Sequence, residues 1–297
     1  LEPLGADTAG SRYLDPDGSF PNHIPNPENE TAMQSILDAV QESKADLGII
    51  FDTDVDRAGA VLSDGTELNR NRIIAMMAAI LLREHPGTTI VTDSITSTGL
   101  AAFIRKHGGV HHRFKRGYRN VINESMRLNR EGHDSQLAME TSGHGALKEN
   151  YFLDDGAYLV TRLLIELARA KKEGYTLESL IADLAEPAES KEFRMNILVP
   201  DFKAYGQKII DELNVYAASQ PGWSVAPDNF EGVRVNLDKA HGDGWFLPGL
   251  SLHDPLIPLN IESDSVGGVR QIAAELAPFL RPFDQLDTSA LLAFAGC

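Results

Sequence analysis

Cysteine, basic residues and long apolar runs are all scarce in this sequence. The single cysteine, Cys297, is the last of 297 residues, which excludes a disulfide within the chain and fits a reducing cytoplasm, where we expect the protein to reside. No apolar run approaches the roughly 20 residues that span a bilayer, so we expect no membrane segment. Lys and Arg total 27 against 43 acidic residues, a net charge of −16, which argues against a nucleic-acid or anionic-membrane partner.

The chain also lacks an initial methionine and a signal-like segment. It begins at Leu1, so we expect it to be a piece of a longer protein. Its composition, 42% hydrophobic and 24% charged residues, suits a soluble globular protein of two or three domains.

Strand and helix patterns alternate through the first part of the chain. Apolar spacing predicts helices at 31–44, 70–84, 96–107 and 157–172, and strands at 47–51, 88–92 and 137–139. This alternation predicts α/β domains, and the unbroken apolar run 47–51 is typical of a strand in a parallel sheet.

Composition shifts near 186–188, which we interpret as a linker. Beyond it, the sequence predicts strands at 192–198, 232–237, 245–246 and 256–262, helices at 201–213 and 268–280, and a short helix in the tail. This order predicts an α+β domain with an antiparallel sheet.

Three aspartates directly follow the apolar run 47–51. Asp52, Asp54 and Asp56 alternate with other residues and are followed by Arg57. In extended backbone, this alternation would point all three carboxylates the same way. Because close carboxylates repel one another and Mg²⁺ prefers oxygen ligands, the pattern predicts a magnesium site.

Two other aspartate-rich motifs compete for this stretch. An EF-hand loop is excluded because it requires glycine at Arg57 and glutamate at Ser63. A phosphatase strand end, with Asp52 as nucleophile and Asp54 as acid/base, remains open, although Asp56 stands where such enzymes usually have Thr or Val.

Further polar stretches suit phosphate and sugar binding. The basic cluster 115–120 contains a glycine beside Arg and Lys, which suits phosphate contact. The polar stretch 140–145 suits hydrogen bonds to sugar hydroxyls. Ser142 and His144 also allow a nucleophile-and-base interpretation, but no orienting acid is evident. His111 and His112 lack a third metal ligand nearby, and we expect them at the surface.

Together these stretches resemble the α-D-phosphohexomutases, the phosphoglucomutase/phosphomannomutase superfamily. The similar segments are 52–57 (magnesium loop, D-G-D-G-D-R), 117–119 (choice of sugar orientation), 140–144 (sugar loop, G-E-x-S-G-H, with Met139 for its leading glycine) and 152–156, which follows that loop.

The resemblance implies a four-domain architecture around a cleft. Residues 1–70 would end the second domain and carry the metal loop, 71–187 would form the third, and 188–297 the fourth. The first domain carries a phosphorylated serine in a T-A-S-H-N-P-like motif. No such motif occurs here, so we expect a chain that is inactive alone and needs that domain in cis or in trans.

The resemblance also implies roles for individual residues. Mg²⁺ would be held by Asp52, Asp54 and Asp56, with Arg57 in support. Hexose phosphates and hexose 1,6-bisphosphate would contact Tyr118, Arg119, Glu140, Ser142 and His144. In the fourth domain, phosphate would contact Ser251 and His253. Gly249 replaces the arginine of the family's phosphate loop, so phosphate binding there would need His253, Arg234 or Arg270 to compensate.

Three functions remain open at this point. The first is the C-terminal portion of a phosphohexomutase, and the second is a free-standing phosphatase that uses Asp52. The third is a module that binds metal and sugar phosphate and works only with a partner chain.

Overall fold

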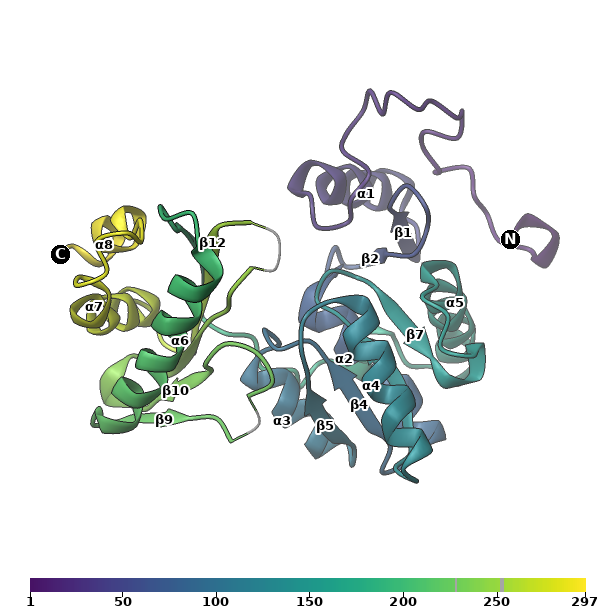
Figure 1. Cartoon of the computed structure of the whole chain (residues 1–297). Coiled ribbons are helices and arrows are strands. Elements are labelled where there is room, and N and C mark those ends of the chain that lie inside the picture. The colour runs from purple at the N-terminus through teal and green to yellow at the C-terminus, as the bar shows by residue number, and fades with distance from the viewer. Residues whose placement is uncertain (228, 252–253) are drawn as a thin grey trace. The chain divides into compact units, whose positions relative to one another are not determined.

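The chain forms two compact units, residues 1–185 and 186–297 (Figure 1). The computed structural model describes residues 1–227, 229–251 and 254–297. In the part of the chain so described, no helix is both long and apolar enough to cross a bilayer.

The first unit opens with a long irregular segment and a helix laid on a small sheet. Helix α1 (Glu30–Ser43) begins at the cap Asn29, whose Oδ1 accepts the Ala32 N–H. Strands β1 (Leu47–Phe51), β2 (Ala58–Leu62) and β3 (Glu67–Leu68) follow. All pairs in this sheet are antiparallel, in the order β1-β2-β3. The expectation of a parallel sheet for 47–51 is therefore wrong, because the chain turns back at 52–57 and pairs with β1 at once.

The rest of the first unit is an α/β sandwich. It comprises α2 (Arg70–Glu84), β4 (Thr89–Thr92), α3 (Thr98–Lys106), β5 (Val110–Arg113), α4 (Tyr118–Arg130), β6 (Ser135–Met139), β7 (Gly145–Leu147) and α5 (Gly156–Glu173). The sheet order is β5-β4-β6-β7; β5, β4 and β6 are parallel, and β7 is antiparallel to β6.

Helices cover both faces of this sheet. Side chains alternate along a strand, so Val91 and Ala138 meet α4 while Ile90 and Leu137 face the larger core built by α2, α3 and α5. Apolar residues on both faces match the unbroken runs expected of parallel strands. Parallel strands also bring the carboxyl ends of β4 and β6 to one edge, where the polar residues that follow them meet.

The second unit is an antiparallel sheet with helices. Its strands are β8 (Glu189–Asn196), β9 (Trp223–Val225), β10 (Val235–Leu237), β11 (Gly244–Pro248) and β12 (Leu256–Ser263), in the order β8-β12-β11-β10-β9. Helices α6 (Phe202–Ser219), α7 (Gly268–Leu280) and α8 (Ser289–Ala295) share one apolar core with these strands. The predicted fold class, α/β followed by an α+β domain with an antiparallel sheet, is confirmed.

Candidate functional site

The three aspartates lie on a tight loop between β1 and β2. The backbone turns rather than extends: Val55 has a φ of 66°, and the Asp52 N–H donates to the Arg57 carbonyl at 3.3 Å. One ligand atom from each of Asp52, Asp54 and Asp56 lies within 4.8 Å of the others. The carboxylates therefore converge as predicted, but through a turn and not through strand alternation.

Arg57 fixes the orientation of Asp52. Its Nε donates to Asp52 Oδ2 at 2.7 Å and its backbone N–H donates to Oδ1 at 3.1 Å. Burial alone would raise the pKa of Asp52, but these bonds outweigh it and hold the pKa below its ordinary value. The Asp52 side chain is only 2% exposed, so Asp52 is a charged, rigidly held acid.

The pKa of Asp56 shifts in the opposite direction. Burial raises its pKa to about 6, and the carboxylates of Asp52 and Asp154 add to this effect against the attraction of His144. Its Oδ1 is buried and accepts no hydrogen bond from the described residues. A cation at this loop would offset the repulsion and occupy that oxygen, so the acid cluster fits a metal ion.

Backbone bonds tie this loop to the loop after β6. Arg57 forms an antiparallel bridge with His144, and the Ala58 N–H donates to the Gly143 carbonyl at 3.4 Å. On another side, the N–H of Gly156, the first residue of α5, donates to the Val55 carbonyl at 3.0 Å. A Cβ at Gly156 would lie 2.9 Å from that carbonyl oxygen, so only glycine allows this approach. Two segments about ninety residues apart thus form one site.

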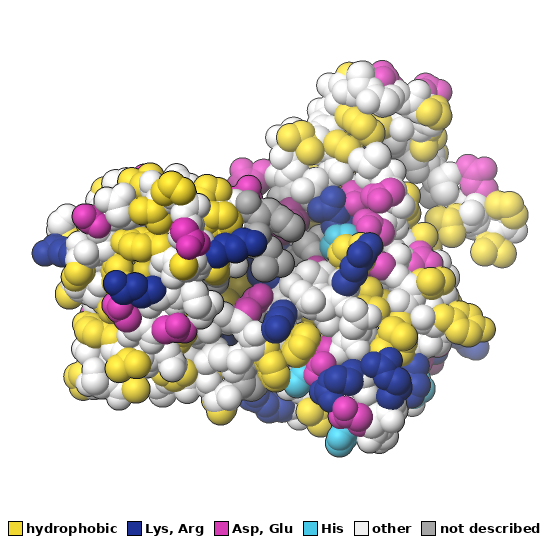
Figure 2. All heavy atoms as spheres, viewed as in Figure 1, with side chains coloured by type: hydrophobic (Ala, Val, Ile, Leu, Met, Phe, Trp, Pro, Cys, Tyr) yellow, Lys and Arg dark blue, Asp and Glu magenta, His cyan; other side chains and the backbone are white. Residues whose placement is uncertain are grey.

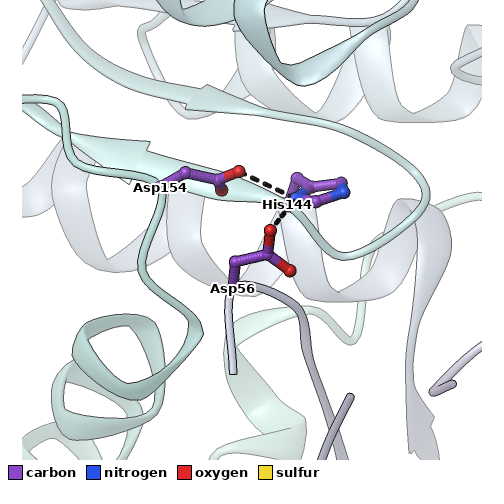
Figure 3. Close-up of side chains that lie close together, drawn as sticks. All are labelled: Asp56, His144 and Asp154. Atoms are coloured by element: carbon purple, nitrogen blue, oxygen red, sulfur yellow. Dashed lines mark hydrogen bonds and ion pairs between the residues drawn. The ribbon is translucent and has the colours of Figure 1, made fainter. Parts of the chain in front are cut away.

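His144 joins the two loops through its side chain. Its Nδ1 lies 2.8 Å from Asp154 Oδ2 and 3.6 Å from Asp56 Oδ2 (Figure 3). Burial alone would lower the pKa of His144, but the two carboxylates, chiefly Asp154, raise it above its ordinary value. The Tyr118 ring stacks on the imidazole at 5.0 Å between centroids.

Glu140 lies at the carboxyl end of β6 and is 5% exposed. Its Oε1 accepts the Gly117 N–H at 2.5 Å. Burial, reinforced by the Asp93 carboxylate, raises the pKa of Glu140 to about 7, even though the Gly117 N–H, His144 and Arg116 favour the charged form. Glu140 is thus poised between neutral and charged forms near neutral pH.

Asp93, at the end of β4, anchors the same loop. Its Oδ2 accepts the Thr141 N–H at 3.0 Å and the Thr141 hydroxyl at 2.6 Å. Asp93 is 1% exposed, and burial raises its pKa. Sequence reasoning missed this residue, although its position just after an apolar strand is a usable signal.

The remaining predicted sugar-site residues surround this centre. Tyr118 and Arg119 begin α4, directly after Gly117, and Arg119 Nε donates to the Tyr118 hydroxyl at 3.0 Å. The Ser142 hydroxyl is 3.5 Å from Glu140 Oε2. On the face drawn in Figure 2, acidic, basic and histidine side chains adjoin one another on the first unit.

His111 and His112, which we expected at the surface, lie within β5 and are only partly exposed. His112 Nε2 is 2.9 Å from the buried Glu124, and His111 Nε2 is 2.8 Å from the Thr92 hydroxyl. Each is engaged in local hydrogen bonding.

The predicted phosphate loop belongs to the second unit. The Ser251 hydroxyl accepts the Asp254 N–H at 3.1 Å, and His253 lies outside the described residues. Arg234 is 4% exposed, with its guanidinium carbon 3.6 Å from the centre of the Trp245 ring. Arg270 is exposed on α7.

Comparison with known proteins gives a consistent result. Residues 4–65 match the family described as phosphoglucomutase/phosphomannomutase, alpha/beta/alpha domain II, and residues 69–187 match domain III of the same family. A phosphomannomutase/phosphoglucomutase of Pseudomonas putida is 32% identical over 274 residues, which cover 92% of this chain and 55% of that protein.

Solved structures agree. A phosphoglucomutase/phosphomannomutase family protein of Burkholderia thailandensis matches with a TM-score of 0.74 and 29% identity, over 92% of this chain and 55% of that one. The N-acetylphosphoglucosamine mutase of Aspergillus fumigatus, solved with GlcNAc-6P and magnesium, shares the fold at a TM-score of 0.53 and 13% identity, over 83% of this chain and 52% of its own. The chain spans about half the length of the curated relatives it matches.

Proposed function

We propose, since this chain belongs to the phosphoglucomutase/phosphomannomutase family, that it supplies the metal loop and the sugar-binding loop of an enzyme interconverting hexose 1-phosphate and hexose 6-phosphate. The reaction would pass through a phosphoserine and a hexose 1,6-bisphosphate. The observation that carries this proposal is the backbone bridge between Arg57 and His144, since it joins the acid cluster to the loop that resembles the family's sugar-recognition loop.

Mg²⁺ is the metal we assign to Asp52, Asp54 and Asp56. Three carboxylates offer the hard oxygen ligands that Mg²⁺ takes, and the buried oxygen of Asp56 without a hydrogen bond fits a ligand atom. When bound, Mg²⁺ neutralises oxygens of the transferring phosphoryl group. Arg57 positions Asp52 and adds positive charge beside the cluster.

The residues of the sugar loop would bind and orient the hexose. Glu140 and Ser142 offer hydrogen-bonding groups at one point of the site, close to the Gly117 N–H. The Tyr118 ring, which stacks on His144, limits how the sugar enters, and Arg119 supplies a cation for a phosphate group. Ser251 and His253 remain the residues we propose for phosphate binding in the second unit.

The phosphoserine would come from outside these 297 residues, because they contain no T-A-S-H-N-P-like stretch. We therefore expect the chain to be inactive until a serine-bearing domain is added, either in the same polypeptide or as a partner. The binding-module hypothesis makes the same expectation. A module that becomes active with a partner differs from a portion of a mutase only in where the serine domain is encoded.

The phosphatase alternative is disfavoured by the state of Asp52. A nucleophilic carboxylate must reach the phosphorus atom, whereas the Asp52 side chain is 2% exposed and both its oxygens accept hydrogen bonds from Arg57.

Phosphorus NMR of α-glucose 1-phosphate with the chain and Mg²⁺ tests the proposal. The spectrum should stay unchanged with the chain alone, and glucose 6-phosphate should appear when the serine domain is added. Asp54→Asn, at an exposed position, should remove that activity without unfolding the chain. Release of inorganic phosphate would favour the phosphatase, and 6-phosphate from the chain alone would contradict the role of the outside serine.

A further inference from the structure

The Asp56 carboxylate faces two different sets of groups. Its Oδ1 lies 4.0 Å from Arg57 Nε, on the side of the aspartate loop. Its Oδ2 lies 3.6 Å from His144 Nδ1, on the side of Asp154 (Figure 3). One oxygen therefore serves the proposed magnesium site, while the other points to a histidine and a second acid.

His144 and Asp154 are held rigidly on that second side. The N–H of Gly145 donates to Asp154 Oδ1 at 3.1 Å, which leaves Oδ2 directed at the imidazole, 2.8 Å from Nδ1. The stacked ring of Tyr118 fixes the plane of the imidazole. Support of this kind for a ligand atom is typical of metal sites, where a hydrogen bond to the far oxygen orients a ligating carboxylate.

We propose that Asp56, His144 and Asp154 form a second cation site, suited to Zn²⁺ or Co²⁺. One ligand atom from each lies within 4.8 Å of the others. Metal–ligand bonds of about 2.0–2.1 Å in a tetrahedral site place ligand atoms roughly 3.3 Å apart. The two measured separations from Nδ1, 2.8 and 3.6 Å, bracket that spacing, so small side-chain movements would admit the ion.

The ligand set determines which ion binds. An imidazole nitrogen with two carboxylate oxygens suits zinc and its late first-row neighbours, whereas the three-aspartate cluster suits magnesium. The two sites share Asp56, so occupation of one changes the affinity of the other. This inference goes beyond the proposed function, because it needs neither the phosphoserine nor a sugar phosphate.

Cobalt titration of the 297-residue chain, followed by visible absorption, tests the site. Co²⁺ replaces Zn²⁺ in such sites and reports its geometry through its d–d bands. We expect the wild-type chain to develop tetrahedral bands, and His144→Gln and Asp154→Asn each to weaken Co²⁺ binding about tenfold or more, since each loses one of three protein ligands. Magnesium binding by these two variants should change much less than cobalt binding, because neither residue is a ligand in the three-aspartate cluster.

Two variants serve as controls. His112→Gln removes another partly buried histidine, which lies beside Glu124, and should leave the cobalt bands unchanged. Asp54→Asn weakens the magnesium site but lies outside the second one. Circular dichroism of each variant verifies folding.

The proposal is overturned if the wild-type chain gives no tetrahedral bands, or if His144→Gln binds Co²⁺ as the wild type does. It is also overturned if Asp54→Asn abolishes the bands, because the cobalt would then occupy the aspartate loop. None of these results bears on the mutase reaction, which the phosphorus spectrum measures separately.

Discussion

Glu140 is a buried acid whose charge state is coupled to folding. Its pKa rises from an ordinary 4.5 to about 7 in the folded chain, first because of burial. Between these two values, the unfolded chain releases a proton that the folded chain retains. The free energy of unfolding therefore falls as pH rises through this window, by about 3 kcal/mol.

Urea unfolding at pH 5 and pH 8 measures this loss. Glu140→Gln keeps an oxygen for the Gly117 N–H but cannot ionise. We expect the variant to lose less stability than the wild type between the two pH values. If the free energy of unfolding changes equally with pH in the two proteins, Glu140 does not titrate in this window.

At the scale of residues, the sequence identified some site residues and missed others. Asp52, Asp54 and Asp56 lie within five residues of one another in the sequence, so their convergence was predictable, although the turn at Val55 that produces it was not. Asp93 reaches Thr141 from 48 residues away, through pairing between parallel strands. Such a contact depends on sheet order, which spacing in the sequence does not contain.

At the scale of elements, Asp155 determines where α5 begins. Its Oδ1 accepts the Tyr158 N–H at 2.9 Å, which pairs one of the amide groups left free at a helix start. Asp155→Ala should lower the free energy of unfolding by about 1 kcal/mol, and Asp155→Asn by less, because asparagine also caps helices well. Thermal unfolding of the two variants at one pH checks this order, and an equal loss in both would refute a capping role.

Strand β2 and helix α4 were not predicted, and both show where local sequence patterns fail to indicate secondary structure. Strand β2 has the sequence AGAVL, whose small residues have weak strand propensity, yet it is buried along its length between α1 and the larger core. Helix α4 begins with Tyr118 and Arg119 inside the basic cluster, and charge there concealed the apolar pair Val121 and Ile122 that contacts the sheet. In both cases tertiary burial overrides local propensity.

At the scale of the whole molecule, the chain has separate apolar cores. The core of residues 186–297 takes its side chains from β8 to β12 and from α6 to α8, all of them within that unit as far as the structure describes it. We predict that the fragment 186–297 folds alone, with a cooperative thermal transition and the circular dichroism of an α+β domain. A gradual change of the circular dichroism signal on heating, without a flat folded-state baseline, would show that the fragment does not fold cooperatively.

The division into α/β and antiparallel α+β parts was predictable because composition and periodicity change together near residue 186. Packing of the small antiparallel sheet against the sandwich was not, since it depends on the short chain reversal after Phe51. That reversal creates the contact of the aspartate loop with both the 140–145 loop and α5.

The approach of α5 to the aspartate loop has a consequence for how this site can change over time. A Cβ added at Gly156 would lie only 2.9 Å from backbone atoms of both Val55 and Arg57, so the helix start and the loop leave no room for a methyl group. A mutation that moves either segment therefore needs a compensating mutation in the other. We expect substitutions in the two segments to be correlated. Gly156→Ala offers an engineer a way to displace all three aspartates without replacing any of them.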